Sequence, residues 1–189
     1  FRKTKGGIKL HTLYDIKTSI PCFIHISTAS VNDMNALDLL YYEPGGYYIL
    51  DRGYVDYERL YRIHQCSAYF VVRAKSNLQF RRIYSNKVNK TGGVLVDQIG
   101  KLTGFYTSKS YPEKLRRIKF YDKETDKELM FLTNNFDLTA EEIAQLYKYR
   151  WKVELFFKWI KQHLKIKSFW GTSINAVKIQ VYSAIIAYC

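Results

Sequence analysis

The stretch around Glu154 carries the residue types that chemistry on a phosphate ester requires. At about 100° per residue on a helical wheel, Tyr147, Arg150, Glu154, Lys158 and Lys161 form one stripe along a predicted helix. A carboxylate can hold a divalent metal ion, and arginine, lysine and the tyrosine hydroxyl can contact phosphate oxygens. The stripe therefore indicates a place where an acidic metal ligand meets basic phosphate contacts.

An ordinary surface helix is the alternative for the same residues. Arg150 and Lys158 stand four residues before and after Glu154, which is the spacing of common surface ion pairs. Two features favour a site: the stripe borders the apolar side of the helix, and it includes Tyr147, an aromatic residue with a hydrogen-bonding tip. The predicted apolar side consists of Leu146, Val153, Phe156, Phe157, Ile160 and Leu164.

A second candidate carboxylate, Asp51, ends a predicted strand. Pro44-Gly45-Gly46 breaks the chain, and the apolar run that follows, residues 47–50, leads directly into Asp51. A helix from about Asp56 to His64 is predicted next. The strand after it, Tyr69–Arg73, has no polar alternation, as expected of a strand buried on both faces.

The remaining elements follow from local signals. Residues 8–14 and 21–28 predict a hairpin around a turn that contains Asp15, and Asn32 or Asp33 can cap a short helix through Leu40. Residues 129–133 predict a buried strand. Thr139-Ala-Glu-Glu142 is a capping box, from which we expect one long helix to about Lys167, and Ser173 is expected to cap a further helix.

Between these elements, residues 76–128 predict a β-rich basic insertion. Residues 75–127 hold 13 basic against 5 acidic residues, whereas residues 26–60 hold 2 against 6. The arginines of the insertion could follow a DNA backbone while its aromatic residues stack on an unpaired base, although charge runs are often only solvated surface. The predicted DNA contacts in the insertion are Arg81, Arg82, Arg116 and Arg117.

Composition supports an anionic partner. The chain has 189 residues, of which 47% are hydrophobic, so it is globular and long enough for one large domain. Its 30 Lys and Arg exceed its 17 Asp and Glu by 13, and a regional excess of this size favours nucleic acid over an anionic membrane surface. Three widely spaced cysteines without a CxxC pair argue against a zinc cluster and indicate a reducing compartment. No apolar run is long enough to span a membrane.

The run Tyr147-x2-Arg150-x3-Glu154-x6-Lys161 resembles the Y-R-E-K signature of the DDE transposases of one large group of bacterial insertion sequences, the insertion-sequence-four-like group. Asp51-Arg-Gly-Tyr54 resembles the second acidic motif of that family, and residues 76–128 resemble its β-rich insert. The resemblance spans nearly all of residues 1–189. It implies an α/β fold, an RNase H-like mixed sheet flanked by helices.

The resemblance also implies a reaction. Asp51 and Glu154 would be the second and third of three carboxylates on two Mg²⁺ or Mn²⁺ ions, catalysing cleavage at the ends of a transposon and attack of the freed 3′-hydroxyl on target DNA. Tyr147, Arg150 and Lys161 would contact the phosphates and the displaced nucleotide beside the scissile bond. The first family carboxylate, on the first core strand, is not present in these residues, and Asp15 is a poor substitute because it lies in a turn. We therefore expect the chain to be an inactive fragment, cut at both ends, of an active parent enzyme.

The implied partners are double-stranded DNA, as terminal repeats and as target, and a second copy of the protein in a synaptic complex, in the cytoplasm of a bacterium. Two other readings remain open. One is an RNase H-like nuclease or resolvase that only hydrolyses DNA. The other is a DNA-binding remnant of a transposase that has lost its activity.

Overall fold

The computed structural model describes residues 8–163, 170–171 and 173–189. The chain divides into two compact units, one made of Phe1–Asn32 and Trp151–Cys189, and the other of Asp33–Arg150. Asp51, Tyr147 and Arg150 belong to the second unit, and Glu154 belongs to the first.

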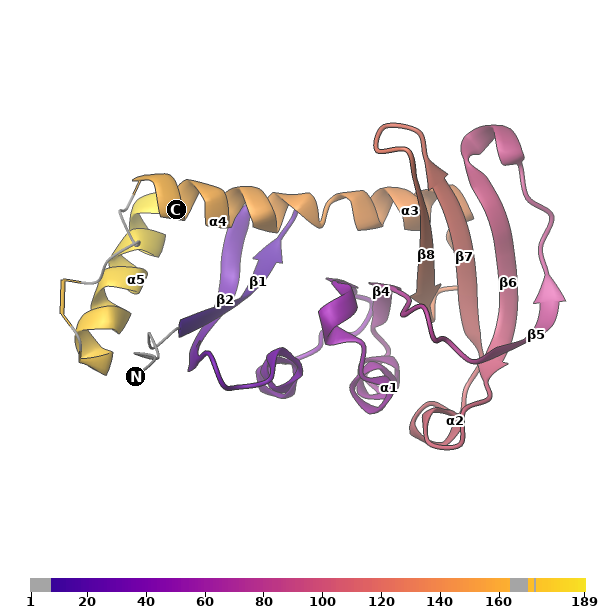
Figure 1. The fold of residues 1–189 in the computed structure, drawn as a ribbon, viewed down its shortest axis with the longest axis horizontal. Coiled ribbons are helices and arrows are strands. Elements are labelled where there is room, and N and C mark those ends of the chain that lie inside the picture. Colours follow the sequence, from indigo (N-terminus) through magenta and orange to yellow (C-terminus); the bar gives the residue numbers. More distant parts are fainter. Residues whose placement is uncertain (1–7, 164–169, 172) are drawn as a thin grey trace, which may run out of the picture. The chain divides into compact units, whose positions relative to one another are not determined.

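The unit of residues 33–150 is built on a mixed six-stranded sheet in the order β3-β4-β8-β7-β6-β5 (Figure 1). Only β3 and β4 are parallel, and every other neighbouring pair is antiparallel. The strands are β3 (Tyr47–Leu50), β4 (Tyr69–Arg73), β5 (Phe80–Ser85), β6 (Val94–Leu102), β7 (Leu115–Asp122) and β8 (Lys127–Thr133). The helices are η1 (Asp33–Leu39), η2 (Arg52–Tyr54), α1 (Tyr57–Gln65), η3 (Lys90–Gly92), α2 (Thr107–Ser110) and α3 (Ala140–Lys148).

The segment predicted as a β-rich insertion supplies half of the strands of this sheet. Strands β5, β6 and β7 all lie within residues 76–128, and they continue the sheet that β3, β4 and β8 begin. The short helix predicted after Asn32 is the 3₁₀-helix η1. Strand β4 has three fully buried central residues, which confirms the predicted buried strand.

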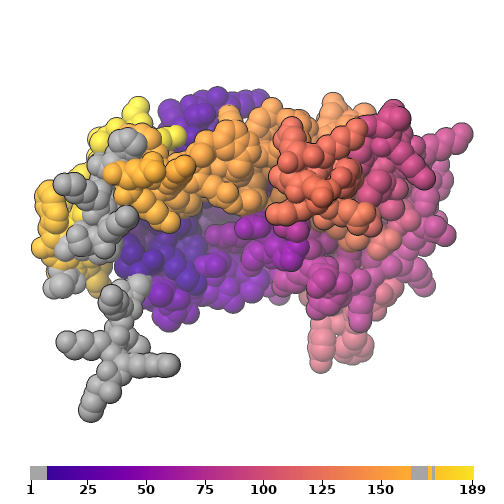
Figure 2. All heavy atoms as spheres, turned by 45° about the horizontal axis from the view of Figure 1, so that its top comes forward, coloured from indigo at the N-terminus to yellow at the C-terminus, as the bar shows by residue number. Residues whose placement is uncertain are grey.

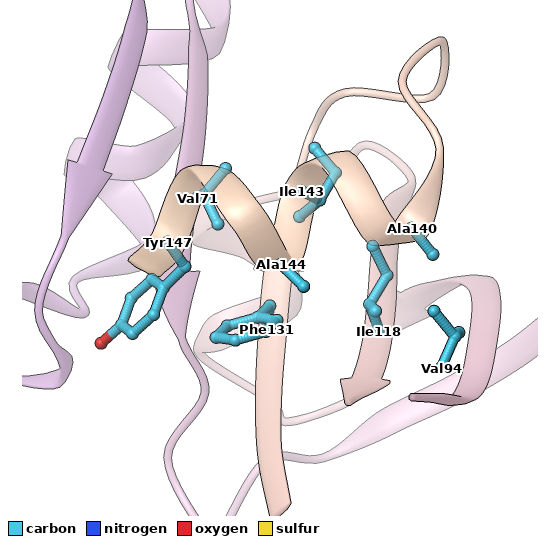
Figure 3. Packing of buried hydrophobic residues seen from close by; sticks show 8 residues of the cluster. All are labelled: Val71, Val94, Ile118, Phe131, Ala140, Ile143, Ala144 and Tyr147. Atoms are coloured by element: carbon cyan, nitrogen blue, oxygen red, sulfur yellow. The ribbon is translucent and has the colours of Figure 1, made fainter. Parts of the chain in front are cut away.

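One face of the sheet packs against α3, and we call it the α3 face (Figure 3). Helix α3 starts at the predicted capping box, in which the side chains of Thr139 and Glu142 each accept a hydrogen bond from the backbone N–H of the other residue. Its buried side chains pack on one residue from each of four strands. The cluster consists of Val71, Val94, Ile118, Phe131, Ala140, Ile143, Ala144 and Tyr147.

The opposite side of the sheet, the reverse face, is covered over β4 by α1 and by Tyr111. The Tyr111 ring is almost fully buried, with its centroid 6.1 Å from that of Phe70 on β4 and 5.3 Å from that of Tyr61 on α1. Leu60 and Ile63 of α1 are fully buried as well. This end of the sheet therefore has a core on both faces.

The turn that joins β7 and β8 is tied to the end of α3. Lys148 lies 3.3 Å from carboxylate oxygens of both Asp122 and Glu124. The pKa of Asp122 is lowered, first by a hydrogen bond from the Thr125 hydroxyl and further by Lys148. In the space-filling view this turn, orange-red near residue 125, lies against the helix that follows it in the chain (Figure 2).

The other unit combines a hairpin with two helices. Strands β1 (Ile8–Asp15) and β2 (Ile20–Thr28) form the predicted antiparallel hairpin. The Asp15 carboxylate accepts hydrogen bonds from the Lys17 N–H and the Thr18 hydroxyl, which agrees with a role in the turn. Helices α4 (Trp151–His163) and α5 (Ile174–Tyr188) bury a separate core of Phe156, Ile160, Val181 and Ile185, and the predicted cap of α5, Ser173, is confirmed.

The single long helix expected from residue 139 to about residue 167 is wrong, because α3 ends at Lys148 and α4 begins at Trp151. The N–H groups of Tyr149 and Arg150 bond back only three residues, to Leu146 and Tyr147. Each helix buries a different residue, Tyr147 in α3 and Phe156 in α4. These residues are nine positions apart, so on one continuous helix they would point in directions about 180° apart. Leu146 is only half-buried, and Leu164 and Lys167 lie outside the described residues.

Candidate active site around Asp51

Asp51 is an exposed carboxylate whose orientation is fixed by the backbone. It directly follows β3 and caps η2, where its Oδ1 accepts a hydrogen bond of 2.7 Å from the Arg52 N–H. Its Oδ2 lies 3.8 Å from Nη1 of Arg150, and the side chain is 54% exposed. The carboxylate is thus held at the end of the strand with one oxygen turned toward a cation.

Tyr147, in the last turn of α3, brings a hydroxyl group to the same region. Its ring is buried against Phe131, with ring centroids 4.7 Å apart, so Tyr147 lies at the edge of the core that the predicted stripe borders. The hydroxyl points away from the rest of the cluster (Figure 3). Burial raises the pKa of Tyr147 first, and Asp51 raises it further. The hydroxyl therefore keeps its proton and can donate a hydrogen bond to a phosphate oxygen.

Three arginines lie near enough to Tyr147 to affect the pKa of its hydroxyl, and two of them were not predicted as site residues. Arg150, Arg73 and Arg52 each act to lower the pKa of Tyr147, against the effects of burial and Asp51. Arg73 ends β4, and the parallel pairing of Leu50 with Val72 puts it beside Asp51. One signal was present in the sequence, since Arg73 ends the apolar strand that follows the strand leading to Asp51. Only the parallel pairing of these two strands brings both side chains to one edge.

The Tyr147 hydroxyl can be tested apart from its ring. We expect Tyr147→Phe to keep the free energy of unfolding within about 1 kcal/mol, because the buried ring stays in place. In the DNA cleavage that the resemblance implies for the full-length protein, loss of the hydroxyl should lower the rate by about tenfold, since one hydrogen bond to a charged phosphate is removed. The matched variant Tyr149→Phe, at an exposed ring outside this cluster, should cleave at the unchanged rate. Equal rates for wild-type protein and Tyr147→Phe would show that Tyr147 only packs.

Glu154 lies in the first turn of α4 and is exposed, as are Lys158 and Lys161. The buried residues Phe156 and Ile160 leave these three side chains on the outer part of the helix. Because Glu154 and Asp51 belong to different compact units, their convergence on shared metal ions stays a prediction.

The donor types fit a hard divalent cation. Carboxylate oxygens are the ligands that Mg²⁺ and Mn²⁺ prefer, and Asp51 Oδ2 is accessible. Among the residues with described positions, however, no group of three or more His, Cys, Asp or Glu side chains is placed to hold a metal ion. In the unit of residues 33–150, Asp51 is thus the one predicted metal ligand.

The four arginines predicted in the insertion have different surroundings. Arg81 and Arg82 lie on the edge strand β5 and are exposed. Arg117 is half-buried on β7, where its guanidinium lies over the Phe80 ring, 4.7 Å from the centroid. Arg116 is buried, with 4% of its surface exposed.

Arg116 is therefore a correction to the predicted DNA contacts. Its guanidinium forms a two-pronged ion pair with Asp97, which is also buried, at 2.9 and 2.8 Å. It also donates to the carbonyl oxygen of Leu138 at 2.5 Å, just before α3. Adjacent residues of a strand point to opposite faces of the sheet, so the side chain of Arg116 points into the core on the α3 face and that of Arg117 points to the reverse face. Its role is structural.

Comparison with known families matches the sequence of this chain to one family. The family model described as the transposase DDE domain matches residues 2–189. The chain belongs to that family. Its mixed sheet flanked by helices confirms the predicted RNase H-like fold of a DDE transposase.

Three relatives are named as transposases. A protein of Sinorhizobium fredii is 38% identical over 96% of this chain and 52% of its own length. A transposase for insertion sequence element IS5377 of Geobacillus stearothermophilus is 31% identical over 97% of this chain and 48% of its own length. One for insertion sequence element IS4SA of Synechocystis is 26% identical over 96% of this chain and 51% of its own length. The chain thus spans about half the length of each of these relatives.

No helix of the described residues is both long and apolar enough to cross a membrane.

Proposed function

We propose that the protein from which this chain comes is a transposase that cuts the ends of an insertion sequence and joins the freed 3′-hydroxyl to target DNA. One observation supports this most directly: in a chain of the DDE family, Asp51 stands at a strand end beside Arg150 and the outward-facing hydroxyl of Tyr147. A carboxylate next to phosphate-binding groups is the arrangement that phosphodiester chemistry needs.

Each side chain has a role in this proposal. Asp51 and Glu154 would hold two Mg²⁺ or Mn²⁺ ions, and such ions would supply an activated water and neutralise the leaving oxygen. Arg150 grips the phosphate beside the scissile bond, and the Tyr147 hydroxyl donates to it. Lys158 and Lys161, on the same helix as Glu154, add point charges along the DNA backbone.

We add two residues to this proposed set. Arg52 and Arg73 flank Asp51, and they extend the positive surface on which the phosphate is placed. An open depression next to Asp51, lined by Arg52, Gly53, Lys75, Ser76 and Asn77, is rich in donors that suit a DNA strand.

The partners in this proposal are the terminal repeats and the target DNA, both double-stranded, with the protein acting as a homodimer in a synaptic complex in the bacterial cytoplasm. In this proposal residues 1–189 form one RNase H-like domain that includes the strands of residues 76–128. On these strands, Arg81 and Arg82 are exposed and Arg117 is half-buried, so all three side chains can contact DNA. That the 189 residues alone are inactive stays a prediction.

Strand transfer separates this function from the two other readings. The full-length protein would be incubated with a labelled transposon end and a supercoiled plasmid, with Mg²⁺, with Ca²⁺ or with EDTA. We expect joined products with Mg²⁺ only. Nicked DNA without any joined product would identify a hydrolytic nuclease, and binding without metal-dependent nicking would identify a DNA-binding remnant.

A further inference from the structure

We propose that Arg82 and Arg117 form a phosphate-binding site on the reverse face of the sheet, which holds the backbone of a DNA segment other than the one at Asp51. Strand register puts both side chains on that face. Arg117 pairs with Leu132 of β8 and Gln98 of β6, and Arg82 pairs with Gly100, whose other neighbour is Leu115. Pairs directly across a sheet share a face, so Arg82 lies on the same side as Arg117, opposite Ile118 and α3.

The guanidinium of Arg117 is held in place before any ligand arrives. It lies over the ring of Phe80, and it donates one hydrogen bond to the side-chain oxygen of Gln98. Gly100 makes room for this platform, because a Cβ there would lie 2.6 Å from the Phe80 ring. A guanidinium has five N–H donors, and this one uses only one of them on Gln98. The guanidinium is therefore held in a fixed orientation with most of its donors left for a ligand.

Within the described part of the chain, no carboxylate pairs with either member of this arginine pair. Burial lowers the pKa of Arg117 first, and the neighbouring Arg82 lowers it further. The next cation on the same face, Lys119, is instead paired with Glu128 at 2.6 Å. The fixed guanidinium of Arg117 and the neighbouring one of Arg82, without a carboxylate, suit a doubly accepting anion such as phosphate.

The site is separate from Asp51 because the two lie on opposite faces. Leu50 shares a register row with Val72, Leu132 and Arg117 on the reverse face, so the next residue, Asp51, turns to the α3 face, where it meets Arg150. Strands β7 and β5 are three and five positions from β3, or roughly 14 to 24 Å at about 4.8 Å per strand. DNA lying at Asp51 cannot touch both guanidinium groups without passing around the sheet.

A duplex, and not a free anion or a membrane, is the expected ligand, because the chain belongs to a DNA-transposing family and carries a net charge of +13. The salt dependence of binding counts phosphate contacts. We would measure the binding of a labelled random-sequence duplex of about 30 base pairs in EDTA, from about 50 to about 200 mM NaCl. Metal is left out so that binding does not depend on the proposed chemistry at Asp51.

The variants are Arg82→Gln/Arg117→Gln and, at an exposed position where a substitution is expected to leave the fold intact, Arg82→Glu alone. The matched control removes the same charge at Lys114→Gln/Lys127→Gln, two exposed positions that, in the described part of the chain, form no hydrogen bond or ion pair with Arg82 or Arg117. We expect the double variant to lower the slope of log affinity against log salt by about two and to weaken binding at low salt at least about tenfold. The control should change the slope by less than about 0.5.

Equal slopes for the double variant and its control would overturn the proposal, as would unchanged binding by Arg82→Glu. Adding Arg150→Gln to the double variant tests whether the site is separate from Asp51. The effects of independent contacts on log affinity add, whereas a non-additive result would mean one shared DNA site. Competition by inorganic phosphate as strong as that by duplex phosphate would indicate a small-anion site. Variants that lose binding to phosphatidylglycerol vesicles but not to DNA would indicate a membrane site.

Discussion

Replacement of Asp51 by Asn or of Glu154 by Gln is expected to abolish DNA cleavage by the full-length protein while leaving DNA binding intact. Either change keeps the side-chain volume but removes the negative charge that holds a divalent ion. The cleavage rate should fall at least about a thousandfold, or about 4 kcal/mol of transition-state stabilisation. Both side chains are exposed, so the thermal unfolding midpoint should stay the same.

Two exposed carboxylates elsewhere in the chain provide matched controls. Asp137→Asn and Glu141→Gln make the same chemical changes outside the Asp51 cluster, and both should cleave at the wild-type rate. Partial recovery of Asp51→Asn in Mn²⁺ would support a role as metal ligand, since Mn²⁺ binds N and O donors more tightly than Mg²⁺. Full cleavage activity in either site variant would remove that residue from the proposed chemistry.

Features with a local cause could be predicted from the sequence. The capping box at Thr139 depends on residues three apart, and the position of Asp51 follows from a Pro-Gly-Gly break and one short apolar strand. Strand β4 could be predicted as buried because four consecutive apolar residues leave no face for solvent. In each case the neighbours that decide the structure are close in the chain.

The misplaced residues depend on contacts between distant segments. The wheel assigned Tyr147 and Phe156 to one helix, but Tyr147 packs on Phe131 of the sheet, and Phe156 packs on α5 and the β1–β2 hairpin. Tyr147 and Phe156 belong to two separate cores, and one continuous helix could not bury both. The helix therefore ends at Lys148, and a new one begins at Trp151. Arg73 was missed for a similar reason, because its place beside Asp51 depends on the pairing of β3 with β4.

The burial of Arg116 likewise depends on distant segments, and it has a large effect on the free energy of unfolding. Alternation in the run Leu115–Phe120 predicts that Arg116 and Arg117 face opposite sides, but not which side α3 covers. The partner that neutralises it, Asp97, is 19 residues away on the neighbouring strand. A charge run that resembles a DNA contact can therefore supply a buried ion pair.

Breaking this pair is expected to destabilise the protein more than any other single change considered. Arg116→Met leaves the Asp97 carboxylate buried without its cation, and Asp97→Leu leaves the guanidinium unpaired, so each should lower the free energy of unfolding by about 3–5 kcal/mol. Urea unfolding followed by circular dichroism measures this. The exposed control Arg81→Met, on the edge strand, should stay within about 0.5 kcal/mol of the wild-type protein.

The double variant Arg116→Met/Asp97→Leu distinguishes a broken pair from a lost side chain. With no buried charge left, it should be more stable than either single variant, with a coupling free energy of about 2 kcal/mol or more. If the losses in free energy of unfolding of the two single variants simply add in the double variant, the interaction between Arg116 and Asp97 does not stabilise the fold.

Recovery should nevertheless be incomplete, because Arg116 also donates to the carbonyl oxygen of Leu138, the residue before the cap of α3. Amide hydrogen exchange should report this remaining defect as faster exchange in α3 than in α1 for the double variant. Since α3 carries Tyr147 toward Asp51, the same variant should cleave DNA more slowly even though neither replaced residue touches the substrate. Unchanged exchange in α3 together with slower cleavage would show that the defect reaches the site by another route.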